Sequence, residues 1–392
     1  MDIGAWGKKG KVVQCQGPWL PPLASPPHPP KLGNIFAPSP ITSHQRQLPS
    51  EAGAPMQLYL DSFAAFLSVK DGQFQIRLSS GEKRLFAVRT VSAILLTKGT
   101  ALSTDAALLA MDGDIPVILI DAQTHYPLGQ IQNGRPGSIA TIRKNQLGFS
   151  RSGDGMQWVA EQIAAKIEGQ RSLLVEWSET RPEFWDDVQS VSKMMTNLAN
   201  RFAKWTPPED FTAVMSTVAE TFRGQEGTAS RLYFEQIAAF LEGKMDFPGR
   251  MKRPAFDPFN AVLNYLYGML YTSVHLALLK SGVDPYIGVL HVDRYGGAPV
   301  MTFDFIEPYR PWADRVALDL ADSGRLTADC FEPDREDRGL WLSREGKSGV
   351  VDAMLAYLQA PTLCNGKKVP RIRQMELDAQ TLAQRLKNFF NV

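Results

Sequence analysis

The pattern of apolar and polar positions changes twice along this chain. In residues 57–131 apolar side chains recur at about every second position, and turn residues separate the runs, as in a series of short strands. One segment in this stretch, residues 103–111, has helical spacing and is followed by Gly113, a residue typical of helix ends. The predicted strands are 58–60, 65–69, 74–78, 85–89 and 116–120.

After Pro136 the apolar positions recur with the helical period of about 3.6 residues. The clearest helix opens at Asp257-Pro258, with a capping carboxylate and a first-turn proline, and ends before Gly282. The predicted helices are 138–148, 156–175, 182–204, 209–222, 228–242, 258–281, 311–322, 345–358 and 374–389. The fold class is therefore α+β: a small N-terminal β-rich domain, residues 56–135, precedes a larger all-α domain, residues 136–392.

The first 55 residues follow neither pattern. They hold 11 of the 27 prolines and almost no periodic apolar positions, which is typical of a disordered or polyproline-like tail or linker. We expect residues 1–55 to have no role in chemistry.

Composition narrows the class of protein. Forty-two basic against 41 acidic residues leave a net charge of +1, so any binding to a polyanion must come from local patches. Three scattered cysteines are too few for a disulfide framework. No apolar run approaches the roughly 18 residues that span a bilayer, so the sequence predicts a cytoplasmic protein with no membrane partner.

Polar groups within apolar surroundings mark three candidate functional segments, because burying such groups is costly without a partner. Glu226 is placed at the start of a predicted helix. It could serve a functional site there, or it could only complement the helix dipole. His291 closes an apolar run and could equally be a structural histidine. Asp304 and Glu307 would share one face of a helical turn, and Arg310 could neutralise Glu307.

Taken together, these segments predict a metal site. Carboxylates and one imidazole form an oxygen-rich donor set that suits Mg²⁺ or Mn²⁺ better than zinc. Such an ion stabilises the charge that develops on a phosphodiester under attack. The sequence therefore indicates phosphoryl transfer.

Four sequence blocks, in this order, resemble the CRISPR-associated endonuclease and integrase family, Cas one. The resemblance begins at Met56 and runs nearly to the end of the chain. The blocks are EGTASRLYF at 226–234, RP with DPFNA at 253–261, DPYIGVLH at 284–291 and DFIEPYRP at 304–311. One departure is Ser230, where alanine is common in the family, and we expect it to change little.

The resemblance implies a β domain followed by a helical catalytic domain, and a divalent-metal site with ligands at Glu226, His291 and Glu307. It places Asp304 beside them as a further catalytic residue. It also implies a homodimer, and a heterohexamer with the small partner Cas two. The implied reaction joins the 3′-hydroxyl ends of a short DNA fragment, the spacer precursor, to a CRISPR repeat by transesterification.

Basic residues near the blocks are candidates for contact with the DNA backbone, because guanidinium groups pair well with phosphate. Arg231 could equally brace Glu226. The DNA-binding candidates are Arg231, Lys244, Arg250, Lys252 and Arg253, and a second cluster is Lys367, Lys368, Arg371 and Arg373. Tyr267, Tyr271 and His275 recur at four-residue spacing, which is more typical of a helix core than of a base-stacking platform.

Two other functions fit the same residues. A metal-dependent nuclease that hydrolyses branched DNA would use water in place of the 3′-hydroxyl. A non-catalytic DNA-binding scaffold would use the acids as ordinary ion-pair partners.

Overall fold

The computed structural model describes residues 56–131, 139–252, 254–291, 298–333, 339–364 and 366–390. The described residues all belong to one compact unit. Residues 1–55, which the sequence predicts to be a tail, lie outside the described residues. The division of the remainder into domains at 135/136 stays a prediction, although the change from strands to helices falls where the sequence places it.

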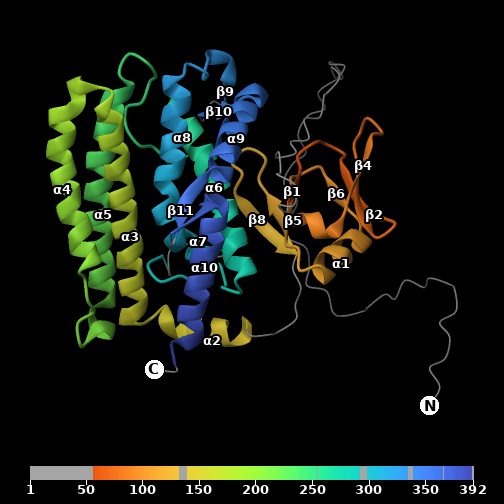
Figure 1. Ribbon diagram of the computed structural model, residues 1–392, viewed down its shortest axis with the longest axis horizontal. Helices are drawn as coiled ribbons and strands as arrows, with labels where there is room; N and C mark the ends of the chain where they lie inside the picture. The colour runs from red at the N-terminus through yellow and green to blue at the C-terminus, as the bar shows by residue number, and fades with distance from the viewer. Residues whose placement is uncertain are drawn as a thin grey trace, which may run out of the picture. The chain divides into compact units, whose positions relative to one another are not determined.

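Two small sheets and one helix make up the N-terminal region (Figure 1). In one sheet the order is β1-β5-β7-β8, in which β1, β5 and β7 are parallel and β8 is antiparallel. The other sheet has the order β4-β3-β2-β6. The elements are β1 (Met56–Leu60), β2 (Phe66–Lys70), β3 (Gln73–Arg77), β4 (Lys83–Phe86), β5 (Val91–Leu96), β6 (Ala101–Leu102), α1 (Thr104–Asp112), β7 (Val117–Ile120) and β8 (Pro127–Ile131).

The first sheet is buried on both faces, which explains its continuous apolar runs. One face carries Ile94 and Val117 into a core shared with the second sheet and α1. The other face presents Leu95 and Ile118 to Leu276 of the long helix α6. The strands are therefore attached directly to the helical region.

The C-terminal region is mostly helical (Figure 1). Helices α3, α4 and α5 lie side by side as one layer, and α3 also contacts α8 and the turn η3. The helices are α2 (Ile139–Phe149), α3 (Gly153–Glu179), α4 (Trp185–Ala203), α5 (Phe211–Leu241), α6 (Pro258–Lys280), α7 (Val300–Phe305), α8 (Arg310–Asp322), α9 (Arg344–Gln359) and α10 (Arg371–Asn388). The short 3₁₀ turns are η1 (Val88–Thr90), η2 (Pro182–Phe184), η3 (Glu307–Tyr309) and η4 (Ala328–Cys330). Two short antiparallel strand pairs are also present: β9 (Phe331–Pro333) with β10 (Leu340–Leu342), and β11 (Pro361–Cys364) with β12 (Lys367–Pro370).

Helix α6 is the central element of the helical core. The side chain of Asp257 caps its first turn by accepting from the Asn260 N–H at 2.8 Å, and Gly282 follows its end with a φ of +79°, as predicted. By length and composition alone α6 could cross a membrane, although the sequence was expected to hold no such run. However, 78% of that apolar window is buried inside the protein, so α6 is a core helix here.

The prediction from the sequence was wrong for one helix that lines the candidate site. Residues 211–241 form a single helix, α5, where two helices were predicted on either side of Gly224 and Gly227. A Cβ atom at either glycine would meet nothing within 4 Å. These glycines therefore lower helix propensity by about 1 kcal/mol each, and packing of α5 on α3 and α4 outweighs that loss.

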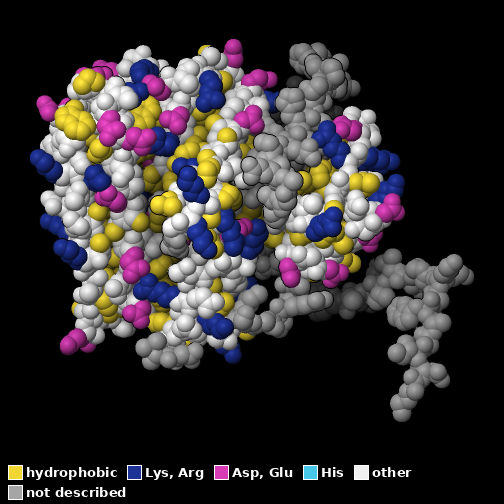
Figure 2. All heavy atoms as spheres, in the orientation of Figure 1, with side chains coloured by type: hydrophobic (Ala, Val, Ile, Leu, Met, Phe, Trp, Pro, Cys, Tyr) yellow, Lys and Arg dark blue, Asp and Glu magenta, His cyan; other side chains and the backbone are white. Residues whose placement is uncertain are grey.

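Surface charge is mixed on the face shown in Figure 2. Acidic and basic side chains alternate over the outer helices, whereas Lys and Arg side chains gather near the middle, over the region that Figure 1 labels β11 and α10. The second predicted basic cluster belongs to this part of the chain. Lys367, Lys368 and Arg373 are exposed, while Arg371 lies over the ring of Tyr357 at 4.0 Å.

Candidate active site

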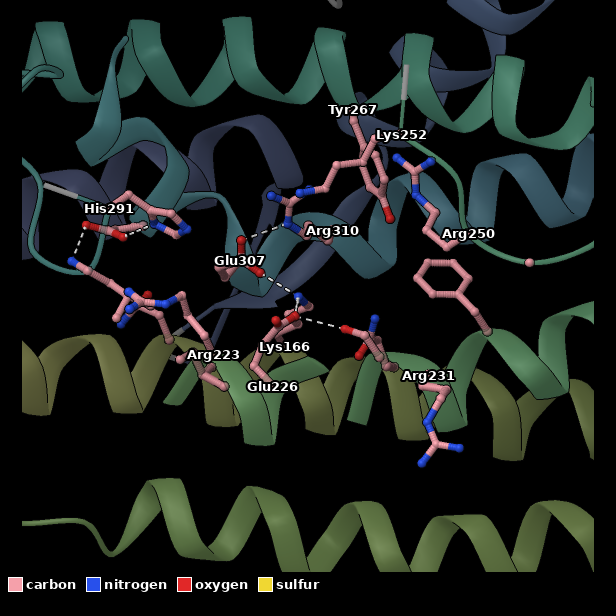
Figure 3. Close-up of a pocket in the computed structure, with 18 of the residues that line it drawn as sticks. Lys166, Arg223, Glu226, Arg231, Arg250, Lys252, Tyr267, His291, Glu307 and Arg310 are labelled. Carbon is pink, nitrogen blue, oxygen red and sulfur yellow. Dashed lines mark hydrogen bonds and ion pairs between the residues drawn. The ribbon is translucent and has the colours of Figure 1, made fainter. Parts of the chain in front are cut away.

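A cavity of about 620 Å³ brings the predicted site residues together (Figure 3). Helices α3 and α5 form one wall of it, and α6, η3 and the segment that ends at His291 form the other. Its charged and imidazole side chains are Lys166, Arg223, Glu226, Arg231, Glu235, Arg250, Lys252, His291, Asp304, Glu307 and Arg310. Residues of all three candidate segments therefore line one cavity.

Glu226 lies in the middle of α5, not at its start, so the helix-dipole explanation for this residue is wrong. Its neighbour one turn on, Ser230, donates a hydrogen bond to Glu226 Oε1 at 2.8 Å. Ser230 therefore helps to orient the carboxylate, at a position where alanine is common in the family.

Lys166 joins the two carboxylates that the sequence assigned to the site. From α3, its Nζ contacts Glu226 Oε1 and lies 2.7 Å from Glu307 Oε2, as Figure 3 shows. The Lys166 side chain is only 7% exposed. Arg310 Nε donates to the other oxygen of Glu307 at 2.8 Å, so the ion pair predicted for Arg310 is confirmed.

These contacts fix the charge state of the cluster. Burial opposes ionisation of Glu307, but Arg310 and Lys166 outweigh it and bring the pKa of Glu307 to about 2. Burial likewise opposes ionisation of Glu226, and the Lys166 ammonium leaves the pKa of Glu226 below its usual value. Both carboxylates are therefore ionised at neutral pH.

Asp304 positions the imidazole of His291. Its Oδ1 lies 2.6 Å from His291 Nδ1, and its Oδ2 accepts the backbone N–H groups of Val289 and Leu290. A carboxylate at Nδ1 fixes the orientation of the ring, so that Nε2 faces away from Asp304. Gly288 permits this arrangement, since a Cβ there would lie 3.0 Å from Asp304 Oδ2.

Tyr267 separates two guanidinium groups on the other side of the pocket (Figure 3). The Cζ atoms of Arg250 and Arg310 each lie 5.1 Å from its ring centre, within cation–π range. The Tyr267 hydroxyl donates to the buried Asp314 Oδ1 at 2.5 Å. Tyr267 is thus a core residue, as predicted, but it also lines the pocket and orders its arginines.

The Tyr267–Asp314 pair leads to a prediction about stability. Burial raises the pKa of Asp314 to about 6, although hydrogen bonding by Tyr267 lowers it. Because the pKa of Asp314 is higher in the folded protein than in the unfolded chain, the folded protein is most stable when Asp314 is protonated. This contribution to the unfolding free energy is fully present below pH ~4 and is lost as the pH rises through ~6. We expect Asp314→Asn to gain stability relative to the wild type between pH 4 and 7, measured by urea denaturation across that range.

A paired variant checks the cause. Tyr267→Phe removes the bond that favours the ionised carboxylate, so its stability should fall more steeply than that of the wild type over the same range. Parallel curves for all three proteins would contradict the assignment of this pH dependence to Asp314.

The predicted DNA-binding residues differ in where they lie. Arg250 and Lys252 line the pocket, and Arg250 is held by the side-chain oxygens of Asn260 and Asn264, each at 2.8 Å. Arg231 also lines the pocket, but it points away from the carboxylates in Figure 3 and pairs with Glu235 at 3.4 Å. The proposed bracing of Glu226 by Arg231 is therefore wrong, because Lys166 has that role.

Lys244 does not line the pocket. It is exposed and pairs with Asp322 at 2.6 Å. Arg253 lies outside the described residues. Lys166 and Arg223, which do line the pocket, were missed; the available signal was the polar series Gln162, Lys166 and Gln170 at four-residue spacing on an otherwise apolar helix face.

The oxygen and nitrogen donors of Glu226, Glu307 and His291 are of the kinds that divalent cations bind. Glu226 and Glu307 already converge on one cation, the ammonium of Lys166. The unshared Nε2 of His291 is a nitrogen donor of the kind metals bind. However, among the residues that the structure describes, no three His, Cys, Asp or Glu side chains lie close enough to hold one ion, so a metal would require Lys166 to leave the carboxylates.

Comparison with known proteins decides the family. A family model described as "CRISPR associated protein Cas1" matches residues 58–355, well over half of the chain. The chain belongs to the Cas1 family. This confirms the resemblance drawn from the four sequence blocks, and the matched range includes Glu226, His291 and Glu307.

Individual relatives agree with this family. A Cas1 relative from Pyrobaculum aerophilum, "CRISPR-associated endonuclease Cas1 2", is 30% identical over 267 residues, which cover 68% of this chain and 83% of the relative. The solved "Cas6-RT-Cas1--Cas2 complex" shares the fold with a TM-score of 0.69 and 21% identity, over 86% of this chain and 35% of that one. The solved "Casposase bound to integration product" has a TM-score of 0.56 and 19% identity, over 85% of this chain and 96% of that one.

Proposed function

We propose that this Cas1 protein is a divalent-metal-dependent DNA integrase of CRISPR adaptation. It would join the 3′-hydroxyl ends of a short DNA fragment to a CRISPR repeat by transesterification. The observation that carries the proposal is the convergence of Glu226 and Glu307 on one buried cation in a pocket that also holds His291. The names of the similar proteins, which include an endonuclease and a casposase bound to an integration product, support the reaction class.

The metal ligands of this proposal are Glu226, Glu307 and His291. When bound, Mg²⁺ or Mn²⁺ would polarise the scissile phosphate and stabilise its developing charge. Asp304 does not face the reacting atoms, because its oxygens serve His291 and two backbone N–H groups. It is a positioning residue that fixes the imidazole.

The basic residues of the pocket would receive the DNA backbone. Arg250 is preorganised by two asparagines and by the Tyr267 ring, so it loses little side-chain freedom on binding phosphate. Arg223 and Lys252 line the same cavity. With a net charge of only +1, the protein attracts DNA through this local cluster rather than through its overall charge.

Partners follow from the same proposal. A solved structure that shares this fold is a complex containing Cas1 and Cas2, which supports a small Cas2 partner for this chain. The homodimer and the heterohexamer with Cas2 are part of the proposal.

The product of the reaction distinguishes joining from hydrolysis. Purified protein with Mn²⁺, a Cas2 partner and a repeat-containing plasmid should join a labelled fragment that ends in a 3′-hydroxyl, and should fail with a 3′-deoxy fragment. Cleavage of branched DNA without joining would favour the nuclease, and activity that survives chelation of all divalent ions would contradict metal dependence.

His291→Ala tests the site within that assay. Loss of one metal ligand should reduce joining by at least about 100-fold, while the far-ultraviolet circular dichroism stays that of the wild type. Unchanged joining by a folded variant would remove His291 from the active site.

A further inference from the structure

Lys166 occupies the position that the proposed metal ion would need. Its ammonium is the cation shared by Glu226 and Glu307, and its side chain is 7% exposed. Glu307 Oε2 has no hydrogen-bond partner in the structure, and the ion pair with Lys166 is its polar contact. Glu307 Oε2, which pairs with Lys166, is therefore an oxygen that a metal ion could bind in place of the ammonium.

Charge balance makes simultaneous binding unfavourable. The two carboxylates carry −2, and Lys166 with Arg310 carries +2, so the buried cluster is neutral as it stands. Adding a divalent ion would leave +2 beside the largely buried Lys166 and Glu307, and like charges within ~4 Å repel each other. If Lys166 leaves the carboxylates while a phosphodiester enters, the charges of Glu226, Glu307, Arg310 and the phosphate together balance the ion, and the ammonium no longer lies against it.

The structure also offers the displaced ammonium a place to bind. Gln170 lies one turn further along α3 than Lys166, lines the same pocket and is 1% exposed. Its Oε1 is buried without a hydrogen-bond partner, and such an atom is costly to leave unsatisfied. An amide oxygen four residues along a helix is within reach of a lysine side chain.

We infer that Lys166 is an internal cation that holds the empty site together and yields Glu226 and Glu307 to the divalent ion, with Gln170 accepting the released ammonium. The inference rests on the proposed function, because it requires a metal at these carboxylates. It makes Lys166 a positioning residue that sets metal affinity and prevents the two acids from repelling each other before the ion arrives.

Metal binding without DNA tests this directly. Lys166→Met keeps the length of the side chain and removes its charge, so we expect about tenfold tighter Mn²⁺ binding or more, since the competing cation is gone, measured by calorimetry and by the Mn²⁺ paramagnetic resonance signal. The metal-free variant should melt at a lower temperature than the wild type, and Mn²⁺ should raise its melting temperature by a larger margin. Lys193→Met, on the exposed face of α4, is the matched control and should match the wild type in every measurement.

The outcomes separate this inference from the proposed function. Mn²⁺ binding to the wild type that depends on Glu226, but is equal or weaker in Lys166→Met, would overturn the role of Lys166 and leave the metal site intact. Absence of Glu226-dependent Mn²⁺ binding in the wild type would overturn the metal site itself. If Lys166→Met does not fold, Lys166→Arg keeps the charge with a stronger hold on carboxylates and should bind Mn²⁺ more weakly than the wild type; equal or tighter binding would overturn the inference.

Discussion

Glu226→Gln should lower the rate of strand joining by about 100-fold or more, which is the scale on which enzymes lose a group that stabilises transition-state charge. The amide has the size of the carboxylate and can still accept from Ser230, but it carries no charge for a metal ion. Lys166 keeps Glu307 as its partner, so the fold should persist. Single-turnover joining of a fluorescent fragment measures the effect.

The matched control for this variant lies on the same helix. Glu220 is exposed on α5 and outside the pocket, so Glu220→Gln should join DNA at the rate of the wild type. If Glu226→Gln and Glu220→Gln had similar rates, the carboxylate on α5 would have no part in the chemistry.

Gly268→Ala should give the largest loss of stability among the variants considered. A Cβ at this position of α6 would lie 1.7 Å from the backbone oxygen of Thr124, and backbone cannot rotate away as a side chain would. Helix α6 would have to separate from the turn before β8, which would break the bond from Thr272 Oγ1 to His125 O. We expect a loss of about 3 kcal/mol in unfolding free energy, measured by urea denaturation.

An exposed glycine provides the comparison. Gly349 lies within α9, and a Cβ there would meet nothing within 4 Å, so Gly349→Ala should stabilise the protein by about 0.5–1 kcal/mol through helix propensity alone. A Gly268→Ala protein as stable as the wild type would show that α6 and the strands are not in the close contact described.

Local signals in the sequence predicted much of the fold and the carboxylates of the site. The caps of α6 lie within a few residues of its ends, so Asp257 and Gly282 could be recognised directly. The strand β5 was missed because no typical turn residue separates it from the segment predicted as the strand 85–89, and its place in the sheet is set by parallel pairing with β1 and β7. Such pairing is formed between residues far apart in the chain, and no local pattern records it.

The same distinction applies to the site. Glu226, His291 and Glu307 were found because each stands out in its own segment, whereas Lys166 is marked only by its place in a polar series on an apolar helix face, which does not identify its partners. Its significance comes from contact with carboxylates 60 and 141 residues away along the chain, at positions 226 and 307. The continuity of α5 was likewise hidden, because Gly224 and Gly227 are poor helix formers and only packing on α3 and α4 overrides them.

Opposite walls of the cavity supply the two acids: Glu226 comes from α5, and Glu307 from the turn before α8. The spacing between the acids is therefore not fixed by any one element, but by how closely the two walls of the cavity pack against each other within one shared core. A small shift of one wall against the other would change the distance between Glu226 and Glu307 and so disable the reaction, without unfolding any helix. Substitutions where the two walls pack against each other, far from any reacting atom, therefore offer a way to change this protein's activity while its helices stay intact.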